Sequence, residues 1–226
     1  MKSAYKFLSS LCLLLASGHL AQADTLRTVA LSGDMAPGTN AVFGLGNGPY
    51  LGLNNSGQVA FMARLTGAQV NANNDYGIWS DRSGNLALIV QEGDQAPGTA
   101  NGVSFKNIGY PSFNNAGRIA FQSDLVGTGV NTTNNEALWS DVSGNWASVV
   151  REGQQAPGTA SGVKFYSDAI VTRFNDSGQT SFFHYLTGTT NNLGIWSEGS
   201  GTLSLVARNG NPDPATGDPF GLTNYG

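Results

Sequence analysis

The chain has 226 residues, a formal net charge of −4, 31 glycines and a single cysteine, and only 12% of its residues are charged. Low charge with frequent glycine and aromatic residues is typical of a turn-rich β protein and excludes intrinsic disorder, which combines high charge with few aromatics. The sequence contains no basic cluster, which excludes nucleic acid and anionic membrane surfaces as expected partners.

The first 23 residues predict a signal peptide. Lys2 and Lys6 form a positive region, Leu8 to Ala16 is an apolar run, and a small-x-small cleavage pattern ends at Ala23. The apolar run is shorter than the roughly 20 residues that span a bilayer. We therefore expect a secreted protein, extracellular or periplasmic, with no membrane span once the signal is removed.

The mature chain, residues 24–226, contains no cysteine because Cys12 lies in the predicted signal peptide. Its formal charge is −6 because Lys2 and Lys6 are removed as well. A disulfide framework, a thiol nucleophile and a cysteine-bound metal are therefore excluded.

Three sequence blocks recur at intervals of about 60 residues. They are a Gly-x-x-Ala-Pro-Gly-Thr block at 33–39, 93–99 and 153–159 with a weaker copy from Gly210, an Asn-x-x-Gly block from Asn54, Asn114 and Asn175, and a Trp-Ser block at Trp79, Trp139 and Trp196. Blocks that keep one period define a tandem repeat. The repeats cover approximately 33–92, 93–152 and 153–209, with a partial repeat at 210–226.

Each repeat predicts four short strands. The clearest strand of the first repeat is 59–65, where Val59, Phe61, Ala63 and Leu65 alternate with other residues in a period of two. It is the second strand of the repeat, and a less regular first strand precedes it. The third strand carries Trp79, and a fourth strand follows. The expected first strands cover 43–53, 105–113 and 165–174, and the expected fourth strands cover 86–90, 146–150 and 203–207.

The recurring polar residues fit turns between these strands. Asn54-x-x-Gly57 predicts a type I turn with a glycine at positive φ, and Asp81-x-x-Gly84 repeats this chemistry in the next connection. We interpret the asparagines and aspartates of both motifs as turn formers in preference to ligands. The Ala-Pro-Gly segment after each fourth strand is interpreted as the crossing to the next sheet.

Tandem four-stranded antiparallel sheets, each with one aromatic set, predict an all-β fold of β-propeller-like blades. A solenoid is the alternative, although its coils are usually shorter. Thr28 to Leu31 occupies the place of a fourth strand without its own blade, and Phe220 to Gly226 that of a first strand. Because closed propellers use about four blades or more, three complete repeats predict an incomplete, open propeller, either truncated or completed by further repeats or a partner chain.

The Asn-x-x-Gly-x-x-Ala-Phe block resembles the secreted bacterial family named for tandem NxxGxxAF repeats, whose members carry varied C-terminal surface anchors. The copies from Asn54 and Asn114 match fully, and the third has Ser181 in place of alanine. The resemblance implies export and association with the cell surface or matrix, and it implies no established reaction. No surface anchor is visible in this chain, which departs from the family pattern.

Catalytic motifs are scarce. The mature chain has one histidine, His184, at the position that Ala63 and Ser123 hold in the other repeats. A general base or metal ligand is one interpretation, but a lone histidine lacks a nucleophile or second ligand. We therefore interpret it as a packed or hydrogen-bonded histidine and predict no catalytic residues and no cofactor.

Acidic residues beside the glycine blocks offer a weak metal prediction. Asp34 and Asp94, with Glu92 and Glu152 nearby, place oxygen ligands of the kind that Ca²⁺ prefers on flexible turns. The third copy has Gln154 instead, so no ring of equal charge forms. The same carboxylates leave open a glycosidase pair contributed by two blades.

The loops between the second and third strands are the expected binding surface. They are rich in Asn, Thr and Gly, and the candidate ligand-binding residues are Asn73, Asn74, Asn134, Asn135 and Trp146. Amides bind sugar hydroxyls, and an exposed aromatic ring stacks on a sugar. Trp146 is favoured as an exposed contact because tryptophan occurs there in one repeat only. Equally, the loops are polar connections that tolerate change.

We therefore expect an exported non-enzymatic β-repeat protein, a surface or extracellular-matrix binding or structural module whose partner is carbohydrate or a cell-surface protein. The alternative is a secreted carbohydrate-active propeller enzyme that uses carboxylates on one rim. Three or more carboxylates converging on a central pocket would favour the enzyme, whereas loops of Asn, Thr and Gly around a filled axis would favour binding.

Overall fold

The computed structural model describes residues 26–44, 50–166 and 173–222, so the predicted signal peptide lies outside the described residues. The described residues form strands and turns without any helix, which confirms the all-β prediction. Sheet one contains β1 (Val42–Gly44), β2 (Leu51–Leu53), β3 (Val59–Thr66), β4 (Tyr76–Ser80) and β5 (Ala87–Gln91). Sheet two contains β6 (Ser104–Lys106), β7 (Ser112–Phe113), β8 (Ile119–Val126), β9 (Glu136–Ser140) and β10 (Ala147–Arg151). Sheet three contains β11 (Lys164–Tyr166), β12 (Arg173–Phe174), β13 (Thr180–Thr187), β14 (Leu193–Ser197) and β15 (Ser204–Arg208).

We call these three antiparallel sheets blades 1, 2 and 3. None of them closes into a barrel, and all share one topology, which in blade 1 runs β1-β3-β4-β5 with β2 also paired to β3. The predicted four-strand pattern is therefore confirmed as an open array of propeller-like blades. The pairing of each fourth strand with the third contains a register shift, which adds local twist. In blade 1 the shift in the β4–β5 pairing lies between Ile78 and Trp79 of β4.

The first strand of each repeat differs from the prediction because it is broken into two short pieces. Both pieces pair with the same long strand, as β6 and β7 do with β8. In blade 2 the break contains Asn107, whose φ of 46° is a left-handed conformation that ends regular pairing. Pairing resumes after Gly109, whose N–H donates to the Gln122 carbonyl at 2.7 Å.

The predicted strand at 28–31 is not a strand. A fourth strand pairs with a third strand, as β5 does with β4, and the described residues offer no third strand to this segment. Its Val29 and Ala30 instead pack against the core cluster that contains Phe61 and Trp79. The other end of the described chain repeats a backbone hydrogen bond seen before blade 3. There the Gly153 N–H donates to the Phe165 carbonyl at 2.9 Å, and here the Gly210 N–H donates to the Phe220 carbonyl at 3.0 Å.

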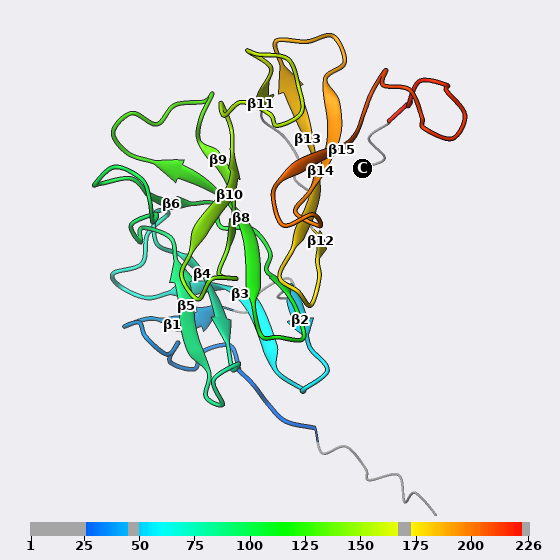
Figure 1. Ribbon diagram of the computed structural model, residues 1–226. Coiled ribbons are helices and arrows are strands. Elements are labelled where there is room, and N and C mark those ends of the chain that lie inside the picture. Colours follow the sequence, from blue (N-terminus) through cyan, green and yellow to red (C-terminus); the bar gives the residue numbers. More distant parts are fainter. Residues whose placement is uncertain (1–25, 45–49, 167–172, 223–226) are drawn as a thin grey trace, which may run out of the picture.

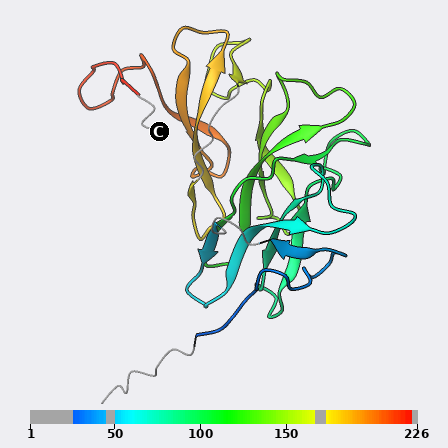
Figure 2. The ribbon, with the colours of Figure 1, turned by 180° about the vertical axis from the view of Figure 1, so that it is seen from behind.

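The blades lie side by side in chain order, from blade 1 with the N-terminal segment to blade 3 (Figures 1 and 2). The core lies between them: Ile78 and Val90 of blade 1 share a buried cluster with Phe105 and Trp139 of blade 2. Leu138 of blade 2 joins the corresponding cluster of blade 3. Adjacent sheets therefore bury facing surfaces against each other, and blade 2 does so on both sides, which is how a series of small sheets obtains a continuous core.

The indole N–H of each recurring tryptophan donates a hydrogen bond within its own repeat, either to the Ala-Pro-Gly loop or to the neighbouring strand. In blades 1 and 3 the indole N–H donates to a proline carbonyl, from Trp79 to Pro37 at 3.0 Å and from Trp196 to Pro157 at 3.1 Å. In blade 2, Trp139 donates instead to the Ser123 hydroxyl at 3.0 Å. A phenylalanine of the first strand meets each tryptophan edge-on, with ring centroids 5.0, 5.0 and 4.9 Å apart in the three blades.

The Asn-x-x-Gly turns close locally and also join successive blades. The Asn114 side-chain oxygen accepts the Arg118 N–H at 2.8 Å, and its amide donates to the Asn175 carbonyl of blade 3 at 2.9 Å. One residue along, the backbone N–H of Asn55 donates to the Asn115 side chain at 2.8 Å, and that of Asn115 donates to Asp176 at 2.9 Å. The most repeated residues therefore form a ladder across the array.

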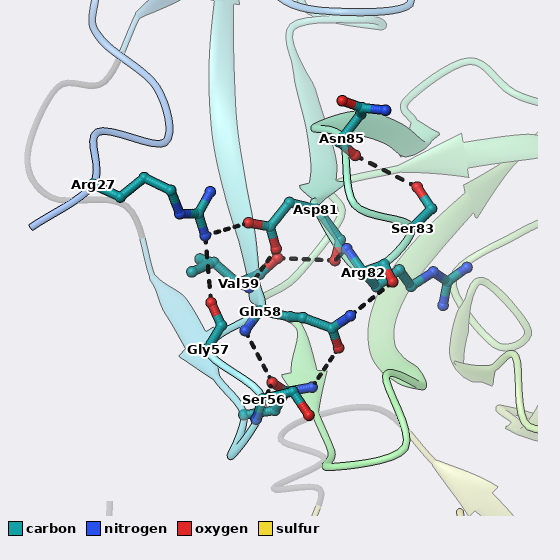
Figure 3. A network of polar contacts seen from close by, with 11 residues as sticks. Arg27, Ser56, Gly57, Gln58, Val59, Asp81, Arg82, Ser83 and Asn85 are labelled. Carbon is teal, nitrogen blue, oxygen red and sulfur yellow. Dashed lines mark hydrogen bonds and ion pairs between the residues drawn. The ribbon is translucent and has the colours of Figure 1, made fainter. Parts of the chain in front are cut away.

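The Asp-x-x-Gly turns connect blades through arginine. Asp81 accepts the backbone N–H of Val59 at 2.7 Å, and Asp141 does the same for Ile119 at 2.7 Å. Arg82 of blade 1 forms an ion pair with Asp141 of blade 2. In blade 1 the N-terminal segment replaces a preceding blade, because Arg27 binds Asp81 at 2.6 Å and the Gly57 carbonyl at 3.3 Å (Figure 3).

Candidate functional site

A pocket of about 410 Å³ opens on blade 2. Three segments line it: the crossing before β6, the loop between β8 and β9, and the end of β10 with the residues that follow it. The lining residues are Ala100, Val103, Thr128, Gly129, Val130, Asn134, Arg151, Glu152, Gly153 and Gln154. One of the predicted binding loops therefore forms a wall of this pocket, which we call the blade 2 pocket.

Asn134 and its counterpart Asn74 shape their loops. The Asn134 side-chain oxygen accepts the Asn131 N–H at 2.9 Å, and its amide donates to the Gly129 carbonyl at 3.0 Å. Asn74 makes the same two bonds, to the Asn71 N–H at 2.7 Å and the Gln69 carbonyl at 3.2 Å. Because both ends of each amide bind within the loop, each of these predicted ligand residues fixes its own loop, and Asn134 thereby holds one wall of the blade 2 pocket.

The other two asparagines have different positions. Asn73 is exposed, and its side-chain oxygen accepts from the Lys106 ammonium at 3.3 Å. Asn135 contributes its backbone, whose N–H donates to the Glu152 carboxylate at 3.1 Å. Only Asn134 of the four predicted asparagines lines the blade 2 pocket.

Sequence reasoning missed Arg151 as a binding group and considered Glu152 only for a calcium site or a catalytic pair. Glu152 is buried, and the Arg151 Nε–H donates to the Asn134 carbonyl at 2.7 Å. Next to them, the Gln154 side-chain oxygen accepts the Arg151 N–H at 3.0 Å. The pocket thus combines a guanidinium, a buried carboxylate and amide groups, which suit a polar, hydrogen-bonding ligand.

Glu92 is the blade 1 counterpart of Glu152. Burial raises the pKa of the Glu92 carboxyl, while the hydrogen bond from the Ile108 N–H and the nearby Lys106 oppose that rise. The Ile108 N–H donates to it at 3.3 Å, which ties blade 1 to the segment between β6 and β7 of blade 2. A carboxylate that holds the neighbouring blade in this way has a structural role.

The Trp146 prediction is wrong as regards exposure. Trp146 is half-buried, packs against the core cluster of blade 2 and meets Phe121 edge-on with ring centroids 4.9 Å apart. Leu86 and Leu203 lie at the equivalent positions of the other blades and pack on their clusters in the same way. Tryptophan replaces leucine here at a core position, so its occurrence in one repeat was not a sign of exposure.

The calcium candidates do not assemble a site in the described part of the chain. The Asp94 carboxylate accepts the Gln91 N–H at 2.8 Å and so closes the turn, as Gln154 does in blade 2. Asp34 lies in the same turn of blade 1. Over residues 26–44, 50–166 and 173–222, no three His, Cys, Asp or Glu side chains come together.

His184 is buried against aromatic rings. Its ring centroid lies 5.0 Å from that of Phe165, and its Nδ1 lies 3.0 Å from the Tyr185 carbonyl oxygen. Burial lowers the pKa of His184 to about 4, and the hydrogen bonds to backbone carbonyls oppose this by raising it. This geometry agrees with the interpretation of a packed, neutral histidine.

A second pocket, of about 370 Å³, lies on blade 3. It is lined by Tyr166, Tyr185, Leu186, Thr187, Gly188, Thr189 and Asn192. The short loop between β13 and β14 supplies its rim. The sequence indicated this loop as a variable surface but did not indicate that β11 brings Tyr166 beside it.

A protein-family model matches most of the chain. A model described as a family of unknown function, DUF7453, matches residues 17–65 and 53–225. No curated protein matches the chain. In the described residues, no helix is both long enough and apolar enough to cross a membrane.

Proposed function

We propose that this chain, which belongs to the DUF7453 family, is an exported, non-enzymatic binding module of the cell surface or extracellular matrix. The blades act as a scaffold, and the loops between second and third strands supply binding walls. The single observation that carries the proposal is the blade 2 pocket, because a loop rich in Asn, Thr and Gly forms it with Arg151, Glu152 and Gln154.

The use of the carboxylates supports binding over catalysis. Asp81, Asp141 and Glu198 each accept a backbone N–H at the start of a long strand, at 2.7, 2.7 and 3.0 Å. Asp94 and Glu152 also accept backbone N–H groups. A glycosidase needs one carboxyl group as an acid and a second as a base or nucleophile facing the same bond. Carboxylates held by backbone donors in separate turns favour a structural role.

Export follows from the predicted signal peptide and is part of the proposal. Expression in a bacterium that secretes proteins should yield a mature chain that begins at Asp24, as measured by N-terminal sequencing and intact mass. A chain retained in the cytoplasm with Met1 in place would contradict it.

The binding proposal is tested by filling the blade 2 pocket. Ala100 is exposed and lines the pocket, so Ala100→Trp should block it without disturbing the core. Ala160 has the equivalent exposed position in the next crossing and does not line this pocket, so Ala160→Trp is the matched control. Retention of the purified chain on arrayed polysaccharides and matrix proteins should fall with Ala100→Trp and persist with Ala160→Trp.

Product analysis on the same array separates the two classes of function. A binding module retains its ligand and releases no product. Turnover of any arrayed glycan by the purified chain would contradict the non-enzymatic proposal and favour the propeller-enzyme alternative. Equal retention of both tryptophan variants would show that the blade 2 pocket is not the binding site.

A further inference from the structure

The blade 3 pocket is chemically different from the blade 2 pocket. Its lining consists of two tyrosines, two threonines, an asparagine, a leucine and a glycine, with no charged side chain among them. The blade 2 pocket contains both Arg151 and Glu152. An uncharged site with aromatic and hydroxyl groups suits a neutral ligand that has both apolar faces and hydroxyls.

Register places the two tyrosines side by side. Tyr166 of β11 pairs directly with Tyr185 of β13. Directly opposed residues of an antiparallel pair have Cβ atoms about 4.5–5.5 Å apart and share one face of the sheet. Phe165 and Leu186 point to the other face, where both belong to the buried core cluster. The core therefore fixes the strands that carry the tyrosine pair.

The pair is specific to blade 3. The equivalent opposed residues are Gly44 and Arg64 in blade 1, and Lys106 and Asp124 in blade 2. Aromatic residues that recur in every repeat are explained by the shared fold, as the tryptophans are. A tyrosine pair that occurs in one blade only is not required by that fold, since blades 1 and 2 form the same pairing without it.

Tyr166 is available for contact. It is 48% exposed and lies at the end of β11, an edge strand of blade 3, where no further strand of the described residues covers it. Its ring and that of Tyr185 give the pocket an apolar wall with hydroxyl groups at its edge. A sugar ring presents C–H groups on its face and hydroxyls around its edge, which matches this wall.

The hydroxyl of Thr189, on the rim of the pocket, already accepts two hydrogen bonds from the protein. The Thr189 hydroxyl oxygen accepts from the Arg208 guanidinium at 3.0 Å and from the Asn191 N–H at 3.3 Å. A hydroxyl has two acceptor lone pairs and one O–H donor. Because both acceptor positions are engaged, the Thr189 O–H is the group of this hydroxyl that can donate to a ligand oxygen.

We propose that the blade 3 pocket binds a neutral carbohydrate, with a sugar ring against Tyr166 and Tyr185 and a sugar oxygen accepting from the Thr189 hydroxyl. This inference names a ligand class within the proposed binding function, but it rests on a different site from the blade 2 pocket. It does not require that pocket to bind the same molecule.

The experiment measures binding of the full exported chain to neutral oligosaccharides, with soluble glucan, xylan and galactan fragments as probes and alginate as an anionic comparison. Isothermal titration calorimetry measures the affinity of each fragment. We expect a neutral fragment to bind and alginate to bind more weakly. Tyr166→Ala should reduce affinity about tenfold, which is typical when an aromatic contact of about 1.4 kcal/mol is lost.

Two further variants keep the test specific. Thr189→Val preserves the shape of the side chain and removes the donor, and it should weaken binding. Tyr110→Ala removes a tyrosine of similar exposure, 53%, that lies outside the pocket, and it should leave binding unchanged. Circular dichroism checks that each variant is folded.

The outcomes separate this inference from the general binding function. Absence of binding to every neutral fragment, or equal loss with Tyr166→Ala and Tyr110→Ala, overturns the carbohydrate site on blade 3. Binding that falls with Ala100→Trp while Tyr166→Ala has no effect also overturns it, yet leaves the blade 2 pocket as the binding site. Loss with Tyr166→Ala and Thr189→Val, without an effect of Ala100→Trp, supports it.

Discussion

The residues that recur most often in this chain are engaged in folding contacts. Asn114 closes its turn and binds the next blade, and Trp139 donates to a hydroxyl inside its own blade. The turn roles were predictable because the Asn-x-x-Gly spacing is local. The contacts between blades were not, because the partner of Asn114 is Asn175, and a sequence pattern does not say which turns meet in space.

Ser123 offers a test of the tryptophan anchoring. It is buried in blade 2 and accepts the indole N–H of Trp139. Ser123→Ala leaves a buried donor without this acceptor, so urea denaturation should show a loss of about 1–3 kcal/mol in the free energy of unfolding. The exposed Ser148 is the control, and Ser148→Ala should change stability by less than about 0.5 kcal/mol. An unchanged Ser123→Ala protein would mean that Trp139 uses a loop carbonyl, as Trp79 does.

His184 predicts a pH dependence of stability. Its pKa is lowered to about 4 in the folded chain from an ordinary value of 6.5. The unfolded chain therefore takes up a proton below about pH 6.5 that the folded chain does not bind until about pH 4. Protonation then favours unfolding, and the free energy of unfolding should fall by up to about 3 kcal/mol as the pH decreases across this window.

The control for this prediction is His184→Ser, which introduces the residue that blade 2 carries at the same position. Denaturation of both proteins between pH 7 and pH 4 isolates the histidine from the carboxyl groups they share. The difference in stability between the proteins should change with pH in the direction that favours the variant at low pH. A constant difference would contradict a neutral buried histidine.

At the scale of elements, the long strands were well predicted and the first strands were not. The period of two over 59–65 appears as β3, Val59–Thr66, and it recurs as β8 and β13. The segment 105–113 was predicted as one strand but is divided by Asn107, whose positive φ is a property of the folded backbone. The segment 28–31 has strand-like residues, but a strand also needs a partner, which composition does not reveal.

The candidate sites were also predicted in part, since the sequence indicated their loops but not the strand residues beside them. The loops that line the pockets were visible as segments rich in Asn, Thr and Gly, because polar loops stand out between apolar strands. Arg151 and Tyr166 were missed because they lie at strand ends and join the loops only through sheet pairing. A possible signal for Tyr166 was its pairing with Tyr185, at positions where the other repeats lack aromatic residues.

The turn ladder predicts different costs for equivalent asparagines. Asn114 and Asn175 make the same turn bond, to the N–H four residues later, at 2.8 and 2.9 Å. Asn114 is buried and also binds blade 3, whereas Asn175 is exposed. Asn114→Ala should therefore lower the free energy of unfolding by about 1 kcal/mol more than Asn175→Ala.

Urea denaturation of both variants measures this difference, and each serves as the control for the other. Equal losses would show that the asparagines contribute through turn closure alone. A larger loss for Asn175→Ala would contradict a role of the ladder in joining blades.

The whole molecule is a linear series in which each blade contacts its neighbours. Blade 2 has both faces covered, while the outer blades each have one face without a neighbouring blade in the described structure. Leu53 on blade 1 is 66% exposed and Val206 on blade 3 is 61% exposed. Phe113 and Val149, their counterparts toward the middle, are partly buried against the core clusters. Stability in such an array is approximately the sum of each repeat and its interfaces.

Hydrogen–deuterium exchange of the purified chain at low concentration tests this open stacked arrangement most directly. The strands β3, β8 and β13 are equivalent and have eight residues each, so their backbone amides can be compared position by position. A series of blades held together by neighbouring faces predicts the slowest exchange in β8, because opening blade 2 disrupts two interfaces. Equal protection of the three strands, or faster exchange in β8 than in β3 and β13, would contradict it.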